Sequence, residues 1–126
     1  MGFVAAGALA LALGVAAGAF GAHGLKNTLS ADLLAIWETG ARYHLVHGLG
    51  LVLVGILAPQ LGRSVRVVGW LLVAGIVFFS GSLYLLALTD TRWLGAVTPI
   101  GGTAWIAAWI TLAVGALKAR SSVSGS

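Results

Sequence analysis

Residues 67–88, VVGWLLVAGIVFFSGSLYLLAL, form a run without a single Asp, Glu, Lys or Arg. A helix needs about 20 apolar residues to cross the hydrocarbon layer of a bilayer, and this run is long enough. Three similar runs predict further membrane-spanning segments at Gly2 to Ala22, Tyr43 to Ala58 and Pro99 to Leu117. Hydrocarbon offers no partner to backbone polar groups, and these runs lack the alternation of a barrel strand, so the sequence predicts an all-α membrane protein, a bundle of four transmembrane helices.

The composition of the whole chain agrees with this prediction. Of the 126 residues, 60% are hydrophobic and only 8% are charged, whereas soluble domains carry about 25% charged residues. A water-soluble globule is therefore excluded. The net charge of +4 comes from basic residues that stand singly or in pairs between apolar runs, which indicates membrane topology and no nucleic-acid partner. Since cysteine is absent, thiolate nucleophiles and Cys-ligated metal centres are excluded.

We expect a single transmembrane domain over residues 1–120 and a disordered polar tail over residues 121–126. The first run is expected to stay on the protein as a helix, because no Lys or Arg precedes it and it is longer than the core of a signal peptide. The amino terminus shares one predicted side with four basic residues and no acid, namely Arg63, Arg66, Lys118 and Arg120. By the positive-inside rule, both termini are predicted to be cytoplasmic.

Local signals refine two of the helices. Ser30 is a good N-cap with Asp32 in the first turn, and Ala31 to Ala41 is predicted to be an amphipathic, interfacial lead-in to the second membrane helix. Thr98 is likewise expected to cap the fourth helix, with Pro99 at its first position. In the first helix, the Gly14-to-Gly18 spacing predicts a close helix contact.

The predicted topology gathers the polar side chains at one level of the bundle, in its outer half. The candidate ligand-binding residues are therefore His23, Glu38, Arg42, Tyr43, His44, His47, Ser80, Tyr84 and Thr98. The spacing of Glu38 and Arg42 favours an ion pair on one helix face, and Arg42 is expected to hold either Glu38 or an anionic lipid headgroup.

His47 has a structural and a functional interpretation. As a structural residue it would be a neutral imidazole bonded to Tyr84, Ser80 or a free carbonyl, tying the second and third membrane helices together. As a functional residue it would bind a ligand or handle protons. Ionisable groups inside a membrane cost free energy and so often have a function, and a histidine titrates near neutral pH.

The start of the fourth helix has a similar ambiguity. Gly101 and Gly102 leave free backbone N–H groups that could hold a phosphate or carboxylate, although such glycines more often permit close packing. Trp105 and Trp109, four residues apart, are predicted to form a packing or lipid-facing stripe.

No motif predicts a catalytic residue, a cofactor or a metal site. The His44-x-x-His47 spacing lacks the zinc-protease pattern, and a metal or haem would need His23 or an acidic residue from elsewhere in the chain. A nucleophile elbow, a P-loop and a dinucleotide fingerprint are all missing from the sequence. We therefore expect a protein that is not an enzyme.

Several strings resemble a known family. They are GAHGL at 21–25, WET at 37–39 followed by Tyr43, His44 and His47, FSGSLY at 79–84, and TPIGG at 98–102. In this order they resemble the domain-of-unknown-function family of small inner-membrane proteins that includes bacterial YgdD and YwdK, with a mitochondrial relative. The resemblance implies a four-helix protein of the bacterial inner membrane and brings no established reaction. Gly40 and Gly48 stand where relatives are expected to have alanine, a departure expected to loosen the second helix.

The leading hypothesis is a non-enzymatic accessory protein, a module that binds a lipid or small ligand in a polar pocket between the outer ends of its helices. Its expected partners are membrane lipids and a homo-oligomer or larger membrane complex. Two alternatives stay open at this point: a proton-coupled transporter or channel formed by an oligomer, and a haem- or metal-binding membrane protein.

Overall fold

The computed structural model describes residues 1–125, and every regular element in that part of the chain is helical. The α-helices are α1 (Gly2–Phe20), α2 (Ala31–Ile56), α3 (Ala58–Leu61), α4 (Ser64–Gly75), α5 (Gly81–Thr89) and α6 (Thr98–Ser124). Two π-helical segments, η1 (Gly21–Leu25) and η2 (Ile76–Ser80), and a 3-10 segment, η3 (Arg92–Ala96), complete the chain. The prediction of an all-helical protein is confirmed.

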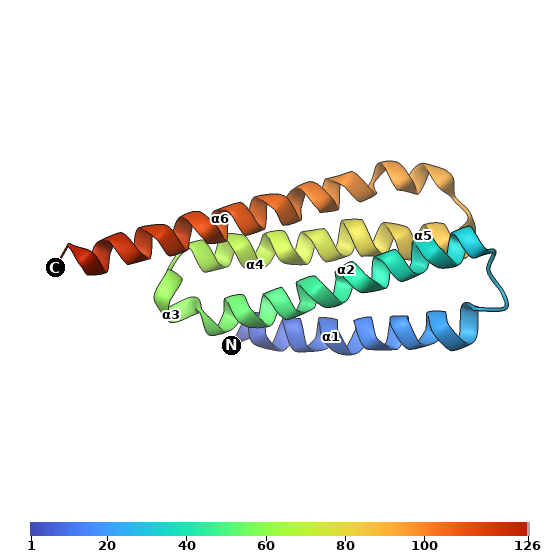
Figure 1. Ribbon diagram of the computed structural model, residues 1–126, viewed down its shortest axis with the longest axis horizontal. Coiled ribbons are helices and arrows are strands. Elements are labelled where there is room, and N and C mark those ends of the chain that lie inside the picture. The colour runs from blue at the N-terminus through green and yellow to red at the C-terminus, as the bar shows by residue number, and fades with distance from the viewer. Residues whose placement is uncertain (126) are drawn as a thin grey trace.

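The elements join into long rods that lie side by side (Figure 1). The π-helical segments continue the helices beside them, so α1 runs on into η1, and α4, η2 and α5 form one rod. Both termini and the short helix α3 lie at one end of the bundle, and the α1–α2 connection and η3 lie at the other (Figure 1). The second and fourth rods are α2 and α6.

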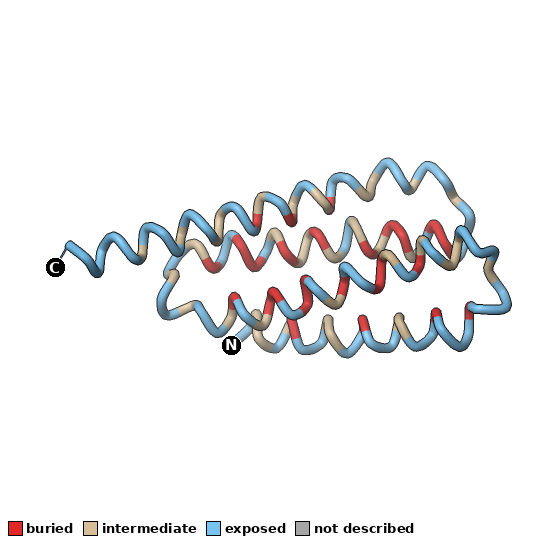
Figure 2. Tube along the Cα trace, in the orientation of Figure 1, coloured by how far each residue is buried: buried red, intermediate tan, exposed pale blue. Residues whose placement is uncertain are grey.

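Three stretches within the described residues are long and apolar enough to cross a membrane: Gly2–Leu25, Ser64–Thr89 and Arg92–Ser124. They correspond to the first, third and fourth predicted spans. Helix α2 is long enough but more polar, since it carries Glu38, Arg42 and two histidines. It packs against α1 and against the α4–η2–α5 rod, and Figure 2 marks its buried positions in red.

The predicted starts of two helices turn out differently. Ser30 caps α2 as expected, because its Oγ accepts a hydrogen bond from the Leu33 N–H at 3.4 Å. Thr98 does not cap α6: its hydroxyl makes no cap hydrogen bond and pairs instead with the Ser82 hydroxyl at 2.6 Å. The disordered tail stays a prediction, although the structure continues α6 as far as Ser124; residue 126 lies outside the described residues.

The close contact between α1 and α2 uses glycines at seven-residue spacing. A Cβ atom built on Gly7, Gly14 or Gly21 would lie within 2.8 Å of an atom of α2. A Cβ on Gly18 would meet nothing within 4 Å. The prediction of a close helix contact is thus confirmed at Gly14 and wrong at Gly18. Seven residues are close to two helical turns, so the three glycines share one face, and Gly18 does not belong to it.

We predict that Gly7→Leu destabilises the protein more than Gly18→Leu. At Gly7 the added side chain meets the backbone N of Val52, which cannot move aside, and overpacking typically costs about 1–3 kcal/mol. At Gly18 the same exchange enters open space. The measurement is thermal unfolding in detergent, with wild type and both variants side by side. Equal melting temperatures for the two variants would show that the α1–α2 seam is not close-packed at Gly7.

Candidate functional site

The ring of His47 uses both of its nitrogens in hydrogen bonds. Its Nδ1 lies 2.8 Å from the carbonyl oxygen of Tyr43, one turn earlier on α2. Because a carbonyl can only accept, Nδ1 carries the proton and donates it. The indole N–H of Trp109 donates to Nε2 at 3.1 Å. His47 is therefore held as a neutral imidazole, with α6 as its partner across the bundle.

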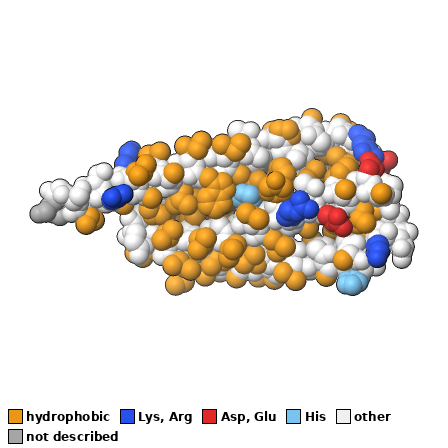
Figure 3. Space-filling view, viewed as in Figure 1, with side chains coloured by type: hydrophobic (Ala, Val, Ile, Leu, Met, Phe, Trp, Pro, Cys, Tyr) orange, Lys and Arg blue, Asp and Glu red, His pale blue; other side chains and the backbone are white. Residues whose placement is uncertain are grey.

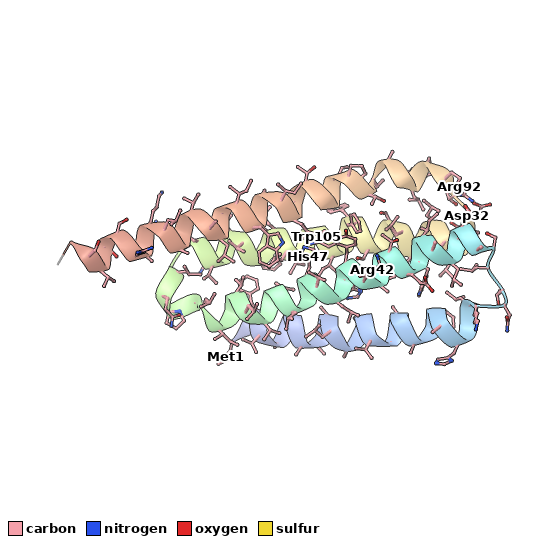
Figure 4. The ribbon with its side chains drawn as sticks, in the orientation of Figure 1. Met1, Asp32, Arg42, His47, Arg92 and Trp105 are labelled. Atoms are coloured by element: carbon pink, nitrogen blue, oxygen red, sulfur yellow. The ribbon has the colours of Figure 1, made fainter. Side chains whose placement is uncertain are left out.

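One face of the same ring is covered by Trp105. The two rings are parallel within 4°, with centroids 3.6 Å apart, and Figure 4 shows them together between α2 and α6. Trp105 is 4% exposed, and its indole N–H donates to the carbonyl of Leu72 at 3.2 Å. The indole lies against Gly75, where any Cβ atom would overlap it. Trp105 is thus fixed by α4 and in turn fixes His47.

This arrangement corrects the predicted partners of His47. It bonds neither Tyr84 nor Ser80, and the carbonyl that it does bond belongs to Tyr43 of its own helix, so His47 does not tie the second and third membrane helices together. The residue that reaches Tyr84 is His44, whose Nδ1 lies 2.9 Å from the Tyr84 hydroxyl. Ser80, fully buried, donates to the carbonyl of Gly40 at 2.8 Å. The hydrogen bonds between α2 and the η2–α5 rod therefore lie nearer the start of α2 than His47 does, about one turn nearer at His44 and about two turns nearer at Gly40.

An open groove lies between α2 and α6, beside the His47 ring. Its cavity has a volume of about 600 Å³. Aromatic rings form most of its walls, and the Tyr43 hydroxyl, on a half-exposed side chain, makes no hydrogen bond with a described residue. The lining residues are Thr39, Tyr43, Val46, His47, Phe79, Gly102, Trp105, Ile106 and Trp109. The groove can accept an apolar molecule and offers it polar contacts at one side.

Several predicted site residues lie outside this groove. His23, Glu38 and Arg42 are exposed, and the predicted Glu38–Arg42 ion pair is wrong, since no N–O distance of 4 Å or less joins them. Gly101 packs against the backbone of Phe79, so close packing accounts for it, whereas its neighbour Gly102 lines the groove. Within residues 1–125, no three His, Asp or Glu side chains come together in a way that could hold a metal ion.

The ion pairs in the described residues lie at the end of the bundle away from the termini. Arg92 contacts Asp32 at 2.9 Å and Asp90 at 2.5 Å, and Figure 4 shows Arg92 and Asp32 side by side. The hydrogen bond from Arg92 lowers the pKa of the Asp32 carboxyl below its ordinary value. Sequence reasoning did not anticipate this link, because its two partners are 60 residues apart.

The groove also contains residues that the sequence analysis did not assign to a site. They are Phe79, for which the sequence predicts no role, and Trp105 and Trp109, which it predicts only to pack or to face lipid. A signal was available in the spacing: Thr39, Tyr43 and His47 recur every four residues, and so do Trp105 and Trp109. That spacing places each set on one helix face, but it does not indicate that the two faces meet.

These features define an all-helical membrane protein whose interior polar groups are paired and whose open groove is aromatic. Residues 17–102 match the family described as "Protein of unknown function (DUF423)". The chain belongs to this family, as its resemblance to YwdK and its relatives predicted.

Close relatives are bacterial and are named as membrane proteins. A UPF0382 membrane protein of Staphylococcus saprophyticus is 53% identical over 116 residues, covering 92% of this chain and 97% of the relative. The UPF0382 membrane protein YwdK of Bacillus subtilis is 49% identical over 118 residues, covering 92% of this chain and 96% of the relative. No solved structure matches the chain. The chain is thus a membrane protein of a family without an assigned function.

We predict a measurable coupling between His44 and Tyr84. In a double-mutant cycle with His44→Ala and Tyr84→Phe, the interaction free energy should be about 0.6 kcal/mol and at most about 1.7, the range of hydrogen bonds between membrane helices. The control cycle pairs Tyr84→Phe with His23→Ala, an exposed histidine in η1, and should show no coupling. Unfolding free energies of the reconstituted protein supply the values; equal coupling in both cycles would contradict the bond.

Proposed function

We propose that the chain crosses the bacterial inner membrane four times, with both termini in the cytoplasm. Helix α2 has 26 residues, or about 39 Å at 1.5 Å per residue, enough to span. It lies alongside two of the three apolar candidate spans, α1 with η1 and the α4–η2–α5 rod (Figure 1), and both of its histidines are buried. Arg63 and Arg66 follow α3 at the end of the bundle where both termini lie, which supports a cytoplasmic assignment for that end.

The topology predicts opposite labelling at the two ends of α2. Because the chain has no cysteine, single cysteines report without background. Asn27→Cys should react with a membrane-impermeant maleimide in intact bacterial cells, whereas Gln60→Cys should react only after lysis. The reverse pattern would invert the proposed orientation. Labelling of both sites from the same side would contradict a membrane-spanning α2.

We further propose that the protein is a binding module whose ligand is a membrane-resident amphiphile, a lipid or lipid-like small molecule. The observation that carries this proposal is the aromatic groove between α2 and α6. Its volume falls within the 300–1,000 Å³ range typical of small-molecule sites. Tyr43, Phe79 and Trp105 would contact the apolar part of the ligand. The Tyr43 hydroxyl would meet its polar part.

The state of His47 supports binding over catalysis. A general base or a nucleophile needs a free lone pair directed at the substrate. In His47 the lone pair of Nε2 accepts from Trp109, and the other nitrogen donates to a carbonyl of its own helix. The ring is therefore neutral, and His47 is only 5% exposed beside the groove. We accordingly propose no catalytic role for it.

The groove can be filled without disturbing the bundle. A Cβ atom at Gly102 would make ordinary van der Waals contact with the Phe79 ring, so Gly102→Leu should place its side chain in the groove. We predict that this variant, purified in gentle detergent, retains about tenfold less bound lipid or small molecule than wild type, as measured by native mass spectrometry. The reason is that a branched side chain takes up the ligand's space.

The matched control for this experiment is Gly18→Leu, the same exchange at a helical glycine that has open space around it. It should retain the ligand like wild type, with both variants showing the melting temperature of a folded protein. If wild type carries no bound molecule, or if Gly102→Leu retains as much as Gly18→Leu, the groove is not a binding site.

A further inference from the structure

The end of the bundle where both termini lie is positively charged. Its four basic side chains are Arg63, Arg66, Lys118 and Arg120. The three acids of the sequence lie elsewhere: Asp32 and Asp90 at the opposite end, and Glu38 on α2, 18 residues or about 27 Å before the end of that helix. Figure 3 accordingly shows basic and no acidic side chains near the C-terminus on the visible face. The charge at this end is therefore not neutralised within residues 1–125.

Arg63 and Arg66 line a hollow at this end, called here the basic hollow. Its volume is about 730 Å³, and Gly62 and Val67 complete its lining. Both arginine side chains are exposed, and neither makes an ion pair or a hydrogen bond with a described residue. Their guanidinium N–H groups are therefore available to a ligand. The planar donor geometry of a guanidinium matches two oxygens of a phosphate or carboxylate.

An apolar pocket of about 470 Å³ lies next to the basic hollow along α4. Its walls come from the start of α1, the junction of α2 and α3, and α4. Arg66, Trp70 and Val73 are four and three residues apart, so they share one face of α4. Arg66 lines the basic hollow, whereas Trp70 and Val73 line the apolar pocket. The pocket thus continues the hollow toward the middle of the bundle, and Trp70 lies about 10 Å along the helix axis from Arg63.

The wall of the apolar pocket is fixed by packing between α1 and α4. The Phe3 ring lies against Gly69, where any Cβ atom would overlap it. The same ring meets Trp70 edge to face, with centroids 6.0 Å apart. Trp70 is nevertheless 62% exposed. Tryptophan is enriched at the boundary between headgroups and hydrocarbon, and its position beyond the arginines places the basic hollow at the level of the headgroups.

The charge and the order of these two parts indicate what occupies them. The occupant carries a negative group at the membrane surface and, joined to it, an apolar chain that extends toward the membrane interior. An anionic phospholipid has this order. An acidic segment of a partner protein would neutralise the arginines, but it would leave the apolar pocket unfilled at the depth of the hydrocarbon.

We propose that this face of α4 binds one anionic phospholipid from the adjacent leaflet. Its phosphate lies between Arg63 and Arg66, and one acyl chain passes Trp70 into the apolar pocket. A basic residue near the membrane surface raises the affinity for anionic lipid by about fivefold, so the arginine pair supplies about 25-fold. The site is separate from the aromatic groove, since none of these three residues lines that groove.

The first test adds lipid to delipidated protein in a non-ionic detergent and follows the melting temperature, because a ligand that binds the folded state raises it. Wild type should bind phosphatidylglycerol at least tenfold more tightly than phosphatidylcholine. The double variant Arg63→Gln with Arg66→Gln should lose most of this preference. Its matched control, Lys118→Gln with Arg120→Gln, removes the same charge from the same end outside the hollow and should keep it.

Two outcomes of this test would overturn the proposal. Equal loss of preference in the two double variants would show that lipid responds only to total charge. Equal affinity of wild type for the two lipids would leave the arginines to an acidic protein partner. Both arginines are exposed and make no contact through their charges, so the variants are expected to fold.

The second test concerns the acyl chain. Ala6 lines the apolar pocket, whereas its neighbour Ala5 is exposed and does not. Ala6→Phe should therefore weaken binding of phosphatidylglycerol by about fivefold or more, and Ala5→Phe should not. Equal affinities of the two variants would overturn the placement of the chain. If Ala6→Phe fails to fold, the arginine comparison still decides whether the lipid binds here.

Inorganic phosphate distinguishes a lipid from a soluble anion. Added without lipid, it should raise the melting temperature of wild type no more than that of the arginine double variant. A shift that depends on the arginines and equals the shift with phosphatidylglycerol would overturn the proposal in favour of a soluble phosphate site. Gly102→Leu should bind phosphatidylglycerol like wild type in this assay, so failure of the groove and failure of this site are separate results.

Discussion

Polar side chains inside this bundle can be satisfied only by one another and by the backbone, because hydrocarbon supplies no hydrogen-bond partner. Among the described residues, every buried side-chain nitrogen or oxygen has one. Several of these bonds join different rods: Trp37 donates to the carbonyl of Ala17, Ser80 to that of Gly40, and Trp105 to that of Leu72. The requirement to pair these groups fixes the lateral order and the axial level of the rods.

Close approach of the helices depends on glycines placed opposite aromatic rings or opposite the backbone of a neighbouring helix. In lipid, helices gain little from the hydrophobic effect and associate through tight packing. The Trp37 ring packs against Gly21 and the Trp105 ring against Gly75, and Gly101 packs on the backbone of Phe79. Packing against Gly75 determines where the Trp105 indole lies. That indole forms one wall of the groove. The groove therefore follows from packing between α4 and α6, although its most polar lining residues come from α2.

Helical fold, the cap at Ser30 and small-residue packing of α1 could be predicted from the sequence, because each depends on local spacing. The hydrogen-bond partner of each buried side chain could not be predicted. Periodicity shows that His44 and His47 lie on the inner side of α2, but not that His44 meets α5 while His47 meets α6. The π-helical segment η2 adds a further difficulty, since its wider turn shifts the faces of all later residues in that rod. The Arg92–Asp32 pair depends on loop geometry, on which helical periodicity gives no information.

The hydrogen bonds of His47 also bear on the kind of function this protein can perform. A histidine that relays protons must release one from a nitrogen and take up another, usually on the opposite side of the ring. Here the Nδ1 proton faces a backbone carbonyl, and Nε2 faces an indole N–H at 3.1 Å. Neither group exchanges protons near neutral pH, and protonation of Nε2 would set two N–H groups against each other. A ligand in the groove would leave both bonds in place, whereas proton transfer would have to break one of them first.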